Sequence, residues 1–173
     1  MKAKIAQGQA SVGTWSTTGD ASVIEVMAHM TELDWITIDF EHNAIDVSTA
    51  VNCLRAAQGS GKPMFARVPY TDRVWIKRVL DIGFTGIVVP DVQNAKQARE
   101  AVSAAKYAPD GMRGIGSARG QIAFGTDFYK KANDITMVVI MIEDKSAVEQ
   151  IDEIMSVEGI DVCFIGPNDL AQS

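Results

Sequence analysis

The stretch MVVIMIE, residues 137–143, is apolar at every position until it closes on Glu143. The stretch GIVVPDV, residues 86–92, has the same character and ends beside Asp91. A strand with one solvated face alternates apolar and polar residues, whereas an unbroken apolar run is typical of a parallel strand that is buried on both faces. These two runs therefore predict an α/β fold, in which helices cover a parallel sheet.

Similar short apolar runs recur along the chain and are separated by segments with helical spacing. The predicted strands are residues 11–17, 34–40, 63–69, 86–92, 136–143 and 161–167. The predicted helices are residues 20–30, 46–58, 72–83, 94–107 and 146–159, several of which begin with Asp, Asn or Ser as an N-cap. This alternation predicts six βα units in one domain spanning residues 1–173, arranged either as a barrel or as a doubly wound sheet.

Two features depart from that rhythm. Residues 107–134 form a Gly-rich stretch, which we interpret as a long functional loop that carries a short helix. The chain also stops just past the sixth predicted strand, whereas a closed eight-stranded barrel typically needs about 250 residues. Either the fold has six strands or the barrel is incomplete.

Composition narrows the function classes. The 173 residues are 47% hydrophobic and carry a formal charge of −6, which argues against a nucleic-acid-binding surface. No apolar run approaches the ~18 residues of a membrane span, and the N-terminus lacks the apolar core of a signal peptide. Cys53 and Cys163 lie in apolar surroundings, which predicts two buried thiols in a reducing compartment. We expect a soluble, cytoplasmic protein.

Polar residues cluster where the predicted strands end. In parallel α/β folds the ligand lies at the carboxyl ends of the strands, so these groups are expected to converge. They are Trp15, the group Asp39 to His42, Arg67, Asp91, Glu143 with Asp144, and the group Gly166 to Asp169.

Three of these residues indicate a metal site, although each has a simpler interpretation. Arg67 interrupts an apolar strand and needs an anion, which could be a substrate or an internal carboxylate. Glu143 could pair with Arg67 or ligate a metal, and Asp169 could simply cap a helix. Two separated carboxylates near a cationic strand end favour Mg²⁺, which takes one or two carboxylates together with water and substrate oxygens. Zinc is disfavoured because no His/Cys cluster is present.

His42 is one of only two histidines. An isolated histidine is usually structural, which is our interpretation of His29, but the carboxylates beside His42 favour a general acid or base whose pKa Asp39 tunes. We assign Glu41 no role beyond a solvated or helix-start carboxylate. Imine chemistry is disfavoured because Lys145, the nearest lysine to these strand ends, begins a predicted helix.

Taken in order, the motifs resemble the HpcH/HpaI-type class II pyruvate aldolases. The resemblance rests on GTWST, DWITIDFEH, ARVP, IKRVLDIGFTGIVVPDV, YAPDGMRGIG, SARGQIAFG, MIE and VEGIDVCFIGPNDL, and it covers nearly the whole chain. It implies a TIM-type (β/α)8 barrel of the phosphoenolpyruvate/pyruvate kind, of which this chain supplies about six βα units. By this resemblance the chain is about two-thirds of a family member and lacks the last two strands and helices.

The resemblance also implies roles for individual residues. Glu143 and Asp169 would bind a divalent metal, with Mg²⁺ the first choice and Mn²⁺ or Co²⁺ as alternatives. Arg67 would contact the pyruvate enolate oxygen, and His42 would be the acid/base group, assisted by Asp39. The remaining implied positions are Trp15 lining the pocket, the backbone of Gly166 and Asn168 at the substrate carboxylate, and Asp81 near the site of a neighbouring subunit.

Some positions depart from the family pattern. Met141 stands where several members have glutamine, Asp144 where serine or threonine is frequent, and Asn168 where a small residue is found. These departures do not change the expected reaction class, but they leave the identity of the substrate open.

Three functions remain open. The first is a metal-dependent aldol lyase that cleaves a 4-hydroxy-2-oxo acid, such as 4-hydroxy-2-oxoheptanedioate or a 2-dehydro-3-deoxy sugar acid, to pyruvate and an aldehyde. The second is another metal–enolate lyase acting on a CoA ester, which the negative charge mildly disfavours. The third is an inactive barrel fragment with a scaffold role. Family members are commonly homo-oligomers, in particular hexamers.

Overall fold

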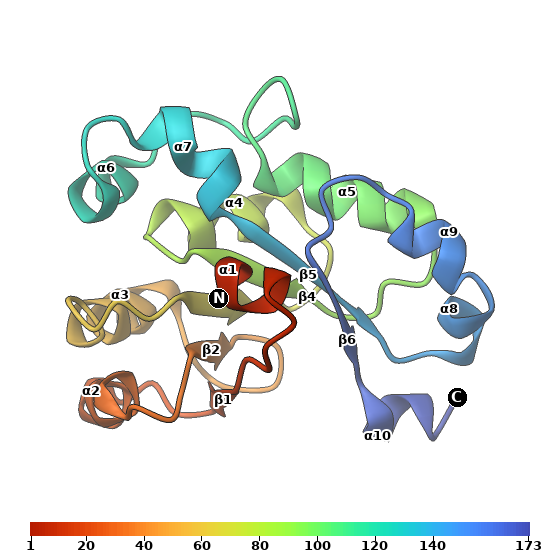
Figure 1. Ribbon diagram of the computed structural model, residues 1–173, viewed down its shortest axis with the longest axis horizontal. Helices are drawn as coiled ribbons and strands as arrows, with labels where there is room; N and C mark the ends of the chain where they lie inside the picture. The colour runs from red at the N-terminus through yellow and green to blue at the C-terminus, as the bar shows by residue number, and fades with distance from the viewer.

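The computed structural model describes residues 1–173, apart from the side chains at positions 2 and 3. Its centre is one parallel sheet whose six strands lie in sequence order, β1 to β6 (Figure 1). The strands are β1 (Gly13–Ser16), β2 (Trp35–Asp39), β3 (Met64–Arg67), β4 (Gly86–Val89), β5 (Met137–Ile142) and β6 (Val162–Ile165). A doubly wound sheet contains a point where the strand order reverses, so the sequential order favours the barrel over that alternative.

The helices are α1 (Lys2–Ala6), α2 (Ala21–His29), α3 (Val47–Ala56), α4 (Arg73–Asp81), α5 (Ala95–Ala105), α6 (Ala118–Phe124), α7 (Phe128–Ile135), α8 (Lys145–Glu149), α9 (Ile151–Met155) and α10 (Pro167–Leu170). All helices except α1 follow a strand, and α2, α3, α4, α5, α8 and α9 contribute buried residues to the cluster on the outside of the sheet. Four of the predicted caps are confirmed, because the side chains of Asp20, Asp46, Asp72 and Asn94 accept hydrogen bonds from first-turn amides. The fifth is corrected, because Asp144 and not Ser146 caps the helix that follows β5. All six predicted strands and the helical segments between them are present, with ends shorter by a few residues.

Three helical predictions need correction. The single helix expected over 146–159 is broken at Gln150 into α8 and α9. The loop 107–134 holds two helices instead of one, because Ser117 caps α6 and Phe128 on α7 buries its ring against Tyr107. The short helices α1 and α10 were not expected from the sequence, although Pro167 is well suited to the first turn of α10.

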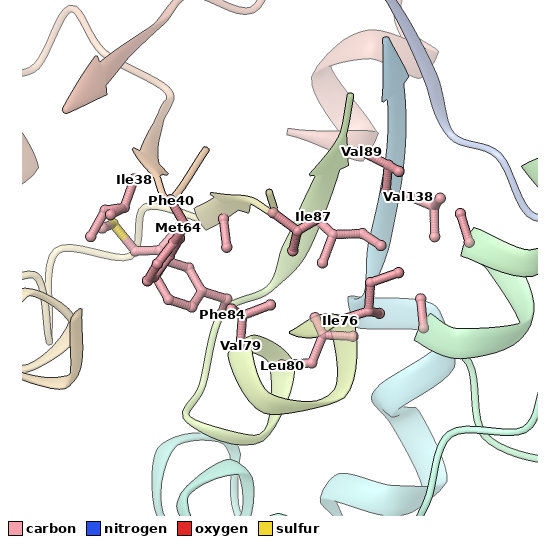
Figure 2. Packing of buried hydrophobic residues seen from close by; sticks show 14 of the residues in the cluster. Ile38, Phe40, Met64, Ile76, Val79, Leu80, Phe84, Ile87, Val89 and Val138 are labelled. Atoms are coloured by element: carbon pink, nitrogen blue, oxygen red, sulfur yellow. The ribbon is translucent and has the colours of Figure 1, made fainter. Parts of the chain in front are cut away.

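The main hydrophobic core lies between the sheet and the surrounding helices. Ile38, Ile87 and Val138 point outward from three strands and belong to the same buried cluster as Ile76 and Leu80 of α4 (Figure 2). All five side chains are at most 1% exposed. This cluster explains why the strands lack alternation: their outward positions are as apolar as their inward ones.

A second apolar cluster fills the concave side of the sheet. Phe65, Val88 and Val139 point inward, and Trp15 and Phe164 pack against them from β1 and β6. The Trp15 and Phe164 ring centroids are 5.5 Å apart although their strands are the two edges of the sheet. The sheet therefore curves until its edges face one another. The fold is a partial TIM-like barrel in which six parallel strands surround a packed interior.

The two thiols differ. Cys53 is fully buried, as expected, but Cys163 is partly exposed, which corrects the prediction of two buried thiols. Cys163 lies on β6, an edge strand with a neighbour on one side only, and Ile165 on the same strand is 48% exposed. Among the described residues, no helix is both long enough and apolar enough to cross a membrane.

Candidate active site

Side chains two residues apart on a strand face the same side, and this explains how a layer of charged residues forms above the apolar interior. Trp35 and Phe65 face inward, so Asp39 and Arg67, at even spacings further along the same strands, face the same side. Glu143 follows the inward-facing Val139 of β5 by four residues and therefore also faces inward. The carboxyl-terminal rim of the sheet is consequently polar, as the sequence predicted.

Asp39 and Arg67 form a bidentate ion pair. They are register partners on β2 and β3, and Arg67 donates from Nε to Asp39 Oδ1 and from Nη2 to Oδ2, both at 2.7 Å. The Asp39 side chain is 3% exposed and that of Arg67 13%. Burial works against a charged Asp39, but the hydrogen bonds from Arg67 and the Glu41 amide outweigh it and hold the Asp39 pKa below its usual value. The internal carboxylate considered for Arg67 is therefore present.

Two further side chains complete the surroundings of Arg67. Its Nη1 lies 2.9 Å from Oε2 of Glu41, and its guanidinium carbon lies 4.8 Å from the centre of a Trp15 ring. The structure thus brings the predicted Trp15 to this site and adds Glu41, for which the sequence predicts no role beyond a solvated or helix-start carboxylate. Burial raises the Glu41 pKa, with Arg67 opposing that shift. Its spacing of two residues from Asp39 was the available signal, because that spacing keeps both carboxylates on one side.

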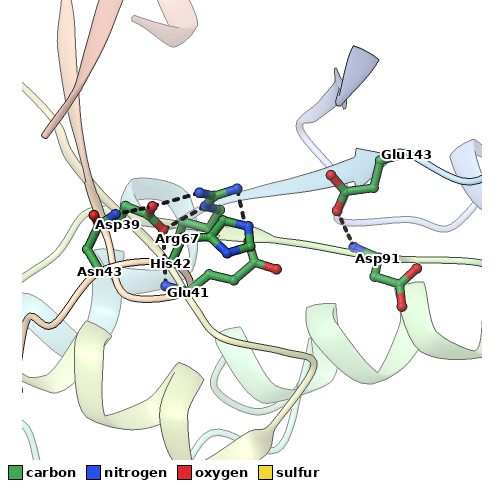
Figure 3. Close-up of polar contacts among 7 residues, drawn as sticks. All are labelled: Asp39, Glu41, His42, Asn43, Arg67, Asp91 and Glu143. Carbon is green, nitrogen blue, oxygen red and sulfur yellow. Dashed lines mark hydrogen bonds and ion pairs between the residues drawn. The ribbon is translucent and has the colours of Figure 1, made fainter. Parts of the chain in front are cut away.

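His42 lies beside this cluster but not in the expected contact. The Asp39 carboxylate is occupied by Arg67, the Glu41 amide and the Asn43 side chain, whereas the His42 imidazole is 64% exposed and its Nε2 lies 3.6 Å from Glu41 Oε2 (Figure 3). The expected pairing of Asp39 with the His42 ring is therefore corrected. Arg67 takes this carboxylate because it faces Asp39 directly across the ladder, whereas His42 lies in the turn after β2.

Glu143 forms a separate group on the other half of the rim. It is 8% exposed, and its Oε1 accepts a 2.7 Å hydrogen bond from the backbone N–H of Asp91. Burial raises the Glu143 pKa; the Asp91 amide opposes that shift and the nearby Asp169 carboxylate adds to it. Gly166 packs so closely that a Cβ there would lie 2.5 Å from Glu143 Oε2. Asp91 had been noted as a strand-end residue but had been given no role.

Asp169 and Asn168 are exposed on α10, immediately after Gly166. Among the described residues, no group of three or more His, Cys, Asp or Glu side chains is arranged to hold a metal. Two carboxylates in electrostatic contact nevertheless fit Mg²⁺, which fills its other positions with water and substrate oxygens. The close approach of Gly166 leaves Glu143 Oε2 unobstructed by a side chain at that position.

Asp81 lies away from these groups. It ends α4, which places it near the amino-terminal edge of the sheet, and its Oδ1 lies 2.8 Å from Nη2 of the buried Arg113. Ser117 also donates to its backbone carbonyl. Within this chain Asp81 therefore holds the segment after α5, and its expected approach to a neighbouring subunit's site stays a prediction.

The comparisons with known proteins are consistent with this geometry. Residues 11–173 match the model of a family described as HpcH/HpaI aldolase/citrate lyase. A 5-keto-4-deoxy-D-glucarate aldolase of Shigella boydii is 36% identical over 172 residues, which are 98% of this chain and 66% of the relative. The corresponding enzyme of Klebsiella pneumoniae subsp. pneumoniae is also 36% identical, and the chain covers 67% of it.

Solved structures show the same fold. An HpcH/HpaI aldolase from Desulfitobacterium hafniense has a TM-score of 0.88 and 34% identity, covering 99% of this chain and 68% of that one. A protein described as a citrate synthase has the same TM-score and identity, covering 100% of this chain and 67% of that one. The chain spans about two thirds of the length of these relatives. This chain belongs to the HpcH/HpaI aldolase/citrate lyase family.

Proposed function

We propose that the protein is a divalent-metal-dependent aldol lyase that cleaves a 4-hydroxy-2-oxo acid to pyruvate and an aldehyde. The observation that carries the proposal is the division of the rim, with a rigid cation at Arg67 on one half and the close carboxylates Glu143 and Asp169 on the other. A 2-oxo acid presents a carboxylate and a ketone oxygen, and such a site can bind these oxygens by a metal and a guanidinium together.

The relatives suggest a substrate class. Several of them are described as 5-keto-4-deoxy-D-glucarate aldolases. Counted from the carboxyl group next to its ketone, that sugar diacid is itself a 4-hydroxy-2-oxo acid. We therefore propose that a 2-dehydro-3-deoxy sugar acid is the preferred substrate, ahead of 4-hydroxy-2-oxoheptanedioate.

Glu143 and Asp169 would hold the metal, with Mg²⁺ the first choice and Mn²⁺ or Co²⁺ as alternatives. When bound, such an ion acts as a Lewis acid that stabilises negative charge on the 2-oxo oxygen. The backbone of Gly166 and Asn168 would contact the substrate carboxylate, because both follow β6 at the rim and Gly166 packs against Glu143.

The Arg67 side chain would stabilise the developing enolate. Its guanidinium is held in place by Asp39 and Glu41 and lies against Trp15, so it does not need to reorganise as charge develops. His42 is exposed at the mouth of the site and would take the proton from the C4 hydroxyl group, directly or through water. With Asp39 committed to Arg67, Glu41 is the carboxylate closest to the His42 ring among the described contacts.

The test is metal-dependent pyruvate release from a 2-dehydro-3-deoxy sugar acid. We expect turnover with Mg²⁺, loss of turnover in EDTA, and loss in Glu143→Gln and Asp169→Asn of about 100-fold or more, because each variant removes a proposed ligand. The matched control is Glu149→Gln, an exposed glutamate on α8, which should behave as the wild type. EDTA-sensitive turnover that survives in both site variants would exclude the assignment.

A second candidate follows from the similarity to a protein described as a citrate synthase. A metal–enolate site of this kind could act on a CoA ester or a citrate-like tricarboxylate. Acyl-CoA or citrate turnover without pyruvate release would favour that function. A well-folded chain with no metal-dependent turnover on any of these compounds would favour the scaffold role.

We also propose that the protein assembles as a homo-oligomer, with a hexamer as the expected state. The support is the family relationship and the place of Asp81, which lies far along the fold from the other site residues and is held by the buried Arg113. In such an assembly Asp81 would serve a neighbouring site instead of its own.

A further inference from the structure

We propose that Asp91 is a positioning residue of the metal site: its left-handed backbone directs an N–H at Glu143 Oε1, which leaves Oε2 as the oxygen that binds the cation. The inference rests on the proposed role of Glu143 as a ligand and adds how that ligand is oriented. Asp91 acts here through its backbone, and its carboxylate is not a ligand.

The turn after β4 provides this amide. Asp91 has a φ of 50°, and it is the only non-glycine residue with a positive φ among those described. The following amide, of Val92, donates to the carbonyl of Met141 at 3.4 Å, so two successive amides point at the end of β5. Asp and Asn are the residues other than glycine that best tolerate this conformation. The backbone at Asp91 is thus bent specifically where it meets Glu143.

Glu143 is held from two sides. The Asp91 amide binds Oε1 at 2.7 Å, and the Cα of Gly166 lies on the other side, where a Cβ would come within 2.5 Å of Oε2 and 2.7 Å of the Glu143 Cβ. With Oε1 engaged by an N–H, Oε2 is the more available donor. A carboxylate fixed in this way binds a metal without first choosing a rotamer.

The Asp91 side chain is engaged in holding the turn. Its Oδ1 accepts a 2.9 Å hydrogen bond from Gln93 Nε2, and the Gln93 amide donates to Gln97 Oε1 at 2.8 Å, which ties the turn to the start of α5. Its carboxylate points away from Glu143 (Figure 3). The competing interpretation makes this carboxylate a third metal ligand, and substitutions separate the two.

The experiment measures Mn²⁺ binding to the 173-residue chain by the loss of the free-ion EPR signal. Asp91→Val disfavours a positive φ and should weaken binding by about tenfold or more, because partners that orient a ligand typically contribute 10–100-fold to metal affinity. Asp91→Gly and Asp91→Asn both adopt this conformation and should bind within about threefold of the wild type. Circular dichroism in EDTA checks the fold of each variant, and Asp91→Ala replaces Asp91→Val if the latter does not fold.

Each outcome has one meaning. The inference is overturned if Asp91→Val binds Mn²⁺ as tightly as the wild type. The same holds for Asp91→Ala if that variant is used instead. Loss of binding in folded Asp91→Gly and Asp91→Asn also overturns it, since the carboxylate would then be the ligand. Wild type that binds no Mn²⁺, or that binds it no better than Glu143→Gln, overturns the proposed metal site itself. Only weakened Asp91→Val or Asp91→Ala, with retained Asp91→Gly and Asp91→Asn, supports the proposal.

Discussion

The two halves of the carboxyl-terminal rim carry charge in opposite ways. On β2 and β3, Arg67 is paired with Asp39 and Glu41 at distances below 3 Å. On β5 and after β6, Glu143 is close enough to Asp169 for their charges to repel, and within the described part of the chain neither forms an ion pair, although the charge of Arg67 partly offsets that of Glu143. In the first half the guanidinium is paired by folding alone, whereas the second half keeps two carboxylates that no ion pair of the described residues balances and that a bound cation would.

This difference separates stability from binding. A buried ion pair that is complete in the folded chain becomes strongly destabilising when one partner is removed, because the other remains as an uncompensated charge. A buried carboxylate without a cation already opposes folding, and its neutralisation relieves that penalty. The pKa is lowered for Asp39 and raised for Glu143, in line with this difference, whereas burial raises the pKa of Glu41 although Arg67 lies beside it.

The largest effect is expected for Arg67→Met. This change leaves Asp39 buried without its bidentate partner, and we expect the free energy of unfolding to fall by about 3 kcal/mol. Urea denaturation measures the loss. Arg99→Met is the matched control, because Arg99 is exposed on α5, and it should change stability by less than about 0.5 kcal/mol. Equal effects at the two positions would show that the pair does not contribute specifically.

A smaller effect of opposite sign is expected for Glu143→Gln in EDTA. Gln keeps an acceptor for the Asp91 amide but removes a buried negative charge beside Asp169. The free energy of unfolding should therefore rise by up to about 1 kcal/mol. The same denaturation measurement applies, with Glu149→Gln as the exposed reference. A clear loss of stability would mean that Glu143 is already balanced without a cation, and the contrast between the halves would not hold.

The smallest effect is the pH dependence of the first half. Because the folded pKa of Asp39 is lowered, its ion pair contributes fully above the usual value of 3.8 and is lost as pH falls through the folded pKa. The stability difference between the wild type and Asp39→Asn should therefore be constant near neutral pH and should shrink below about pH 4. Thermal unfolding at a series of pH values checks this. A difference that persists unchanged into strong acid would exclude the ionised pair as its source.

The sequence predicted the sheet well because its signals are local. The apolar runs on β4 and β5, such as the one that closes on Glu143, need apolar packing on both faces, which the helices supply outside and the barrel interior supplies inside, and the N-cap side chains mark where those helices begin. The second helix in 107–134 was missed because it depends on packing with distant residues, such as Phe128 on Tyr107. The split at Gln150 was missed as well, and the hydrogen bonds of Gln150 are local.

The positions of the strand-end residues were predicted from the sequence, but their pairings were not. Arg67 and Glu143 were expected at the rim because they end apolar strands. The partner of Asp39 was assigned to His42 because the two are close in sequence, while the ladder places Arg67 directly across from Asp39. Glu41 and Asp91 were expected among the converging strand-end residues but were given no role, because a carboxylate that makes a specific contact has the same appearance in a sequence as one that does not.

By itself, therefore, the sequence determined the parallel α/β architecture, the inward positions of the charged residues and the family. The period of two in a strand and the apolar content of each run are properties of neighbouring residues. Only the tertiary structure decided which carboxylates Arg67 pairs with, and that Glu143 is held by the Asp91 amide near Asp169. These depend on the register and curvature that bring separate strand ends together, with Trp15 and Phe164 in contact across the interior.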